Sequence, residues 1–145
     1  MIDINKEIKT AILSKDSVRL ASLRAIKTAF MMAETEKGAT SLTVERKLKI
    51  IQKQVKQRKD AALIYQEQGR ADLAEVEISQ VAILESFLPD QMSDEEIENV
   101  VKLVITDLGA SSMADMGKVM GIASKKMSGQ ANGKVIADKV RQLLT

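Results

Sequence analysis

The stretch that decides the fold class lies at residues 93–109 and reads SDEEIENVVKLVITDLG. Ser93 followed three residues later by Glu96 is a capping box, a pairing that starts a helix. Apolar residues then recur at helical spacing as far as Gly109, a residue type that commonly ends helices with a left-handed backbone. The stretch therefore predicts an amphipathic α-helix with both of its ends marked.

Similar signals along the rest of the chain predict an all-α fold. Gly38, Gly69 and Gly129 each follow a segment of helical period, where a left-handed residue ends a helix. No run alternates β-branched and polar residues as a half-buried strand would. Seven helices are expected, at about residues 2–13, 17–37, 44–68, 72–87, 94–108, 113–127 and 133–144.

A domain boundary is expected near residues 89–93, because Pro89 disfavours a helical residue before it and cannot continue a helix. The prediction is a helical N-terminal domain at residues 1–90 and a three-helix C-terminal domain at residues 91–145. The N-terminal domain is expected to hold four helices, two of them joined as a long hairpin through Gly69. The residues of this hairpin expected to face inward are Val44, Leu48, Ile51, Val55, Ala62, Leu73, Val76, Ile83, Leu84 and Phe87.

Missing residue types exclude several kinds of chemistry. The chain has no Cys and no His, which excludes a thiol nucleophile, a Ser-His-Asp triad and a zinc site. With no Trp, one Tyr and two Phe, base stacking on single strands is disfavoured. No catalytic residue, metal or cofactor is expected. Because the first residues lack an apolar signal region and no segment has the length of a membrane span, a cytoplasmic protein without a membrane partner is expected.

Charge is unevenly distributed although the net charge is only +2. Residues 44–60 and residues 117–145 each carry a net charge of +5, whereas residues 71–101 carry −9 and no Lys or Arg. In a structural interpretation, the basic third helix lies antiparallel to the acidic fourth and their charges compensate. In a functional interpretation, a basic face remains free to meet a polyanion. The basic segment at 117–145 has no obvious acidic neighbour in sequence.

Three features of the C-terminal part each allow two interpretations. Gly117 and Gly121 indicate either close helix packing or approach of the backbone to a phosphate, with Lys118 adding charge. Residues 128–134 are either an ordinary helix connection or an exposed loop that contacts a sugar–phosphate backbone. A group of methionines fills a small core or forms an adaptable partner groove; its members are Met113, Met116, Met120 and Met127.

Several segments together resemble the GatB/YqeY family, most closely its stand-alone YqeY proteins. The resemblance extends from about residue 16 to the end of the chain. It is carried by residues 56–59 (KQRK), 68–74 (QGRADLA), 77–84, 87–89 (FLP), 116–121 (MGKVMG), Gly129, 131–133 (ANG) and 140–144.

The resemblance implies a module that binds tRNA or another structured RNA. The family links these proteins to the tail of the B subunit of a glutamine-dependent aspartyl/glutamyl-tRNA amidotransferase, a carbon–nitrogen ligase whose catalytic domain this chain is too short to contain. An amidotransferase or tRNA synthetase is therefore a possible partner, and a protein–protein adaptor without an RNA role is a further alternative. The matching positions expected to contact RNA are Lys118, Lys125, Lys126 and Lys134, followed by Lys56, Arg58 and Arg70.

Overall fold

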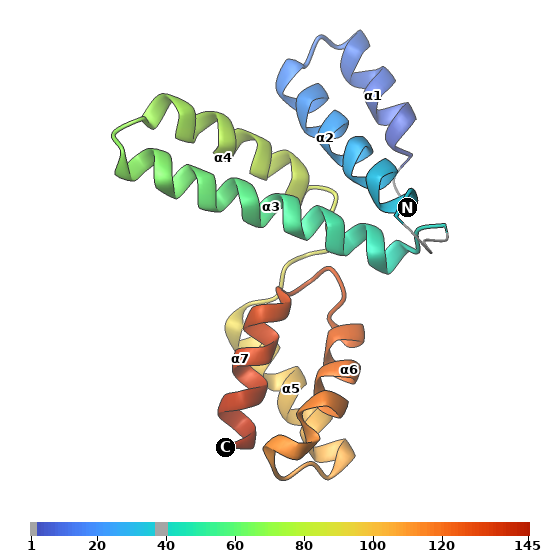
Figure 1. The fold of residues 1–145 in the computed structure, drawn as a ribbon, viewed down its shortest axis with the longest axis vertical. Coiled ribbons are helices and arrows are strands. Elements are labelled where there is room, and N and C mark those ends of the chain that lie inside the picture. The colour runs from blue at the N-terminus through green and yellow to red at the C-terminus, as the bar shows by residue number, and fades with distance from the viewer. Residues whose placement is uncertain (1–2, 37–40) are drawn as a thin grey trace. The chain divides into compact units, whose positions relative to one another are not determined.

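A computed structural model describes residues 3–36 and 41–145 of the chain (Figure 1). This described part contains seven α-helices and a short 3-10 helix, and no strand, so the predicted all-α class is confirmed. The expected helix start at Ile2, the expected end at Lys37 and the stop signal at Gly38 lie outside the described residues. The chain forms two compact units, residues 1–88 and residues 89–145.

The described residues of the N-terminal unit contain four helices, and three of them begin at a side-chain cap. The helices are α1 (Ile4–Leu13), α2 (Ser17–Glu34), α3 (Val44–Glu67) and α4 (Ala71–Glu85). The side chains of Asp3, Asp16 and Thr43 each accept a hydrogen bond from a backbone N–H in the first turn of the helix that follows. Such caps satisfy donors that have no partner inside the helix.

The helices α3 and α4 form the expected antiparallel hairpin. Its turn passes through Gly69 with a φ of +71°, a conformation that glycine adopts without steric cost. One ion pair crosses the hairpin, from Lys59 Nζ to Glu85 Oε1 at 2.9 Å. Within the described residues, this ion pair is therefore the only one by which the charges of α3 and α4 compensate each other across the hairpin.

The core of the N-terminal unit contains fully buried side chains from α2, α3 and α4, namely Leu23, Ile26, Ile51 and Leu84. Two residues expected to face inward do not. Val44 begins α3 and is exposed in its first turn. Val76 is also exposed, because the buried side of α4 follows Ala74, Val81 and Leu84, and Val76 points to another side of the helix.

The C-terminal unit packs α5 (Asp94–Leu108), α6 (Met116–Lys126) and α7 (Gly133–Leu144) around a second core. The capping box is confirmed, since Ser93 Oγ accepts from the Glu96 N–H and the Glu96 carboxylate accepts from the Ser93 N–H. Gly109 ends α5 in the left-handed conformation, also as predicted.

The sixth expected helix differs from the structure in its first turn. A 3-10 turn over Met113–Asp115 precedes α6, and the Asp115 side chain accepts a hydrogen bond from the Ser111 N–H behind it. Met127 is buried and Met116 and Met120 pack against the core, as the core interpretation of the methionines predicts, whereas Met113 is exposed. No helix in the described residues has the length and apolar character needed to cross a membrane.

Candidate nucleic-acid interface

The solvent side of α6 carries two of the predicted RNA-binding lysines in one row. Val119 and Ala123 point into the core, which leaves Lys118 and Lys125 on the opposite side of the helix, both exposed. They stand seven residues apart, which is two turns or about 10 Å along the helix axis. The helix therefore presents two cations on one straight line.

The backbone beside these two lysines is open. A Cβ atom built on Gly117 or Gly121 would meet nothing within 4 Å, and both glycines are exposed. Close packing against another helix of the C-terminal unit is therefore not the reason for the glycines, and for this unit that interpretation is wrong. A row of lysines beside bare backbone allows a bulky ligand to approach α6 closely.

Ile122 lies next to these lysines and is a residue that the sequence analysis missed. It is exposed although it is a large apolar residue, and no motif in the sequence singles it out. Helical spacing indicates this position, because Ile122 follows Lys118 by four residues and so lies at the edge of the core-facing side, next to the lysine row.

The four predicted lysines of α6 and α7 differ in their effect on helix stability. Lys125 and Lys126 lie in the last turn of α6, where a cation interacts favourably with the helix dipole. Lys134 lies in the first turn of α7, where a cation is unfavourable, and Lys118 lies in the first turn of α6. Helix stability thus accounts for the first two lysines and leaves Lys118 and Lys134 unexplained.

The connection itself is a packed structural element. The Gln91 side chain donates to the Gly129 carbonyl at 2.7 Å, and the Met92 N–H donates to the Gln130 carbonyl at 2.9 Å. Gly129 and Ala131 are buried. The first part of the connection is therefore packed, whereas Asn132, Gly133 and Lys134 are exposed, and their contact with a sugar–phosphate backbone stays a prediction. The connection holds the end of α6 beside the start of α7 (Figure 1).

The four predicted lysines of the C-terminal unit are exposed. None of Lys118, Lys125, Lys126 and Lys134 forms an ion pair within the residues that the structure describes. On the same unit, Arg141 is neutralised by Asp138 at 3.0 Å. Within the described residues, the unpaired cations of the C-terminal unit therefore lie on α6 and α7.

The three predicted residues of the N-terminal unit differ from this set. Arg58 is half-buried and donates from Nε to Gln80 Oε1 at 2.8 Å, so it ties α3 to α4. Arg70 pairs with Asp72 at 3.1 Å, and its hydrogen bonds lower the pKa of that carboxyl. Only Lys56 is exposed without an ion pair, and it belongs to the other unit. Of the seven predicted residues, four therefore lie in the C-terminal unit and three in the N-terminal unit, where Arg58 and Arg70 already bind other side chains.

The described residues contain no group of three or more side chains suited to hold a metal ion. Fold and surface together define an all-helical protein of two units whose second unit carries a row of unpaired lysines. Over residues 2–144 the sequence matches the family described as Yqey-like protein, and the chain belongs to this YqeY family.

The curated relatives carry the name "Altered inheritance of mitochondria protein 41, mitochondrial". The protein from Clavispora lusitaniae is 30% identical over 107 residues, which cover 72% of this chain and 62% of the relative. The protein from Kluyveromyces lactis is 29% identical over 111 residues, which cover 74% of this chain and 60% of the relative. The protein from Pyrenophora tritici-repentis is 26% identical over 145 residues, which cover 97% of this chain and 78% of the relative. The chain thus spans about three fifths of the first two relatives.

The expectation of a cytoplasmic protein is wrong, because these relatives are named as mitochondrial proteins. The expectation came from the lack of an apolar signal region. That feature does not distinguish one compartment inside the cell from another.

Proposed function

We propose that the C-terminal unit binds structured RNA, with tRNA as the first candidate, and performs no catalysis by itself. The observation that carries the proposal is the row of Lys118 and Lys125 beside the open backbone of Gly117 and Gly121. Lys126 and Lys134 extend the positive charge around the end of α6. The family resemblance to the amidotransferase tail supports tRNA over other polyanions.

The expected mode of binding is contact with phosphates and RNA shape. Helical RNA is recognised mainly through phosphates, 2′-hydroxyl groups and overall form, and this mode needs no aromatic platform. Two lysines about 10 Å apart along α6 suit contact with separate phosphates of one backbone. The glycines remove the side chains that would hold that backbone away from the helix. Each neutralised phosphate contributes to the salt dependence of binding.

The binding experiment compares tRNA with a duplex RNA of the same length at two salt concentrations. Because the relatives are named as mitochondrial, the tRNA is prepared from mitochondria as well as from whole cells. Salt-dependent binding that favours tRNA supports the proposal. Failure to bind either RNA at low salt refutes it.

Two double variants separate a binding role from a helix-stabilising role. Lys118→Ala with Lys134→Ala removes cations from two first turns, so binding should weaken while stability stays constant or rises by about 0.3–1 kcal/mol per site. The salt slope should fall by about 1.4–1.8 for two lost phosphate contacts. Isothermal titration and urea unfolding measure the two effects.

The matched variant is Lys125→Ala with Lys126→Ala, which removes cations from the last turn of α6. Both binding and stability should fall, because these lysines also interact with the helix dipole. Lys102→Ala on α5 serves as a control for general loss of charge in the same unit. Equal RNA affinity for the Lys118/Lys134 variant and the wild type would contradict the proposed site.

A second proposal is an accessory role beside a glutamine-dependent carbon–nitrogen ligase. It is favoured by the resemblance of residues 116–121 to the amidotransferase tail and by the exposure of Gly117, Lys118 and Gly121 in that segment. Affinity capture with and without nuclease distinguishes the two roles. A ligase subunit retained after nuclease treatment supports a protein partner, and loss of the subunit indicates a bridge made of RNA.

A further inference from the structure

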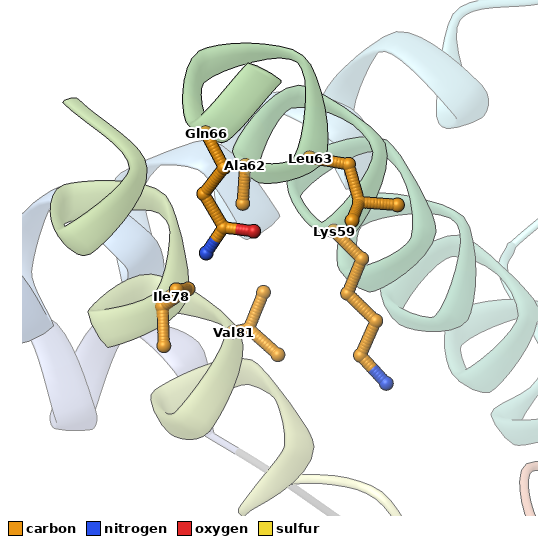
Figure 2. A pocket seen from close by; sticks show the side chains of 6 residues that line it. All are labelled: Lys59, Ala62, Leu63, Gln66, Ile78 and Val81. Carbon is orange, nitrogen blue, oxygen red and sulfur yellow. The ribbon is translucent and has the colours of Figure 1, made fainter. Parts of the chain in front are cut away.

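The α3–α4 hairpin carries a hollow of about 350 Å³ that the RNA-binding proposal does not use (Figure 2). Its lining residues are Lys59, Ala62, Leu63 and Gln66 from α3 and Ile78 and Val81 from α4. Four of these six side chains are aliphatic. The Lys59 ammonium is held by Glu85, so the mouth of the hollow is mainly apolar.

Two large apolar side chains of this lining remain in water. Leu63 is 58% exposed and Ile78 is 49% exposed, although Ala62 and Val81, which line the same hollow, are buried. Covering apolar surface is worth about 25 cal/mol per Å². An apolar hollow bordered by exposed aliphatic side chains is therefore typical of a binding surface.

The charges beside the hollow are of opposite sign on the two helices. Lys56 lies one turn before Lys59 on α3, and Glu75 lies one turn before Ile78 on α4. Both are exposed, and neither forms an ion pair within the described part of the chain. An occupant that pairs with both residues must therefore carry an anion opposite Lys56 and a cation opposite Glu75.

We propose that the occupant is a second copy of this chain. In a twofold pairing the same patch serves both partners, so the patch must complement itself. The hairpin meets this condition, because a rotation that places α3 on the partner's α4 brings each Lys56 toward a Glu75 of the partner subunit. Leu63 and Ile78 of each copy then cover the hollow of the other. A polyanion such as RNA would meet the acidic side of α4 and be repelled.

The first test is the mass of the full chain in solution as a function of concentration, from about 1 µM to about 1 mM, by analytical ultracentrifugation. A reversible dimer is expected for the wild type. Leu63→Glu and Ile78→Glu should each abolish it, because each puts a charge into the covered hollow. Val76→Glu is the matched control, since Val76 is 52% exposed on the same helix but does not line the hollow.

The second test uses the charges. Lys56→Glu alone and Glu75→Lys alone should each weaken self-association about tenfold or more, because like charges then meet twice in a twofold interface. An equimolar mixture of the two variants should restore association, since every contact between the two kinds of chain is again between opposite charges. Only a partner with this chain's own pattern gives that result.

Several outcomes would overturn the inference. They are a monomeric wild type across the whole concentration range, a dimer that survives Leu63→Glu and Ile78→Glu, or a mixture that associates no better than its components. Circular dichroism of each variant verifies that the helices are retained. All five positions tested are exposed, so the substitutions leave the buried core unchanged.

Discussion

Arg70 shows how one side chain acts on the ionisation of another at the tip of the hairpin. Its guanidinium donates to both carboxylate oxygens of Asp72, at 3.2 Å and 3.1 Å. These hydrogen bonds lower the pKa of Asp72, because they stabilise the charged form of the carboxyl. Arg70 is thereby neutralised, which argues against a leading part for it in RNA binding.

Replacing Arg70 by Ala should raise the pKa of Asp72 toward its ordinary value. A carboxyl with a depressed pKa in the folded state contributes stability at neutral pH, and this contribution is lost as the pH falls through the folded-state pKa. The wild type and Arg70→Ala should therefore differ less in stability at acid pH than at neutral pH. NMR titration of the Asp72 side chain measures the shift. Lys53→Ala, which leaves the pair intact, should not change it.

The candidate site shows what sequence can predict about single residues. The sequence correctly predicts that Lys118, Lys125, Lys126 and Lys134 are exposed cations, because charge and helical period are local properties. The roles of Arg58 and Gly129 were not predictable in this way. Arg58 bonds to Gln80 on another helix, and Gly129 accepts from Gln91 across the unit. Such contacts depend on tertiary packing between residues that lie far apart in sequence.

Among the elements, α5 has the most explicit boundary signals. Ser93 and Glu96 exchange hydrogen bonds at its start, and Gly109 ends it with a φ of +63°. These features were read directly from sequence because they depend only on neighbouring residues. The start of α6 was placed three residues early, because a 3-10 turn and a helix share nearly the same pattern of apolar residues.

Replacing Ser93 by Ala should destabilise the C-terminal unit by about 1 kcal/mol, the usual cost of losing a side-chain N-cap. The Glu96 N–H would lose its side-chain acceptor. Urea unfolding followed by circular dichroism measures the change. Ser112→Ala is a matched control, because Ser112 precedes a helical turn without capping it through its side chain. A loss of stability that is equal in both variants would contradict the role of the cap.

The whole molecule has two separate sets of buried side chains. Leu23, Ile26 and Ile51 belong to the set in residues 1–88, whereas Val101 and Ile136 belong to the set in residues 89–145. Hydrophobic burial is the main source of stability in each unit. The two units are therefore expected to unfold as separate cooperative bodies.

Leu23→Ala and Ile136→Ala test this expectation, since each should cost its own unit about 2–5 kcal/mol. Hydrogen exchange followed by mass spectrometry should show faster exchange in residues 3–36 and 41–88 for the first variant. The second variant should accelerate exchange in residues 89–145 alone. Acceleration throughout the chain by either substitution would mean that the units unfold together.

The distribution of methionine sulfur has a consequence for redox chemistry. Met31 and Met32 are exposed on α2, so peroxide would convert them to sulfoxides with little effect on packing. Met127 is buried in the C-terminal unit, with Met116 and Met120 packed against the same core. A sulfoxide there would place a polar oxygen among aliphatic side chains. Oxidative damage would therefore loosen the lysine-bearing unit, and methionine sulfoxide reductases would be the enzymes able to reverse it.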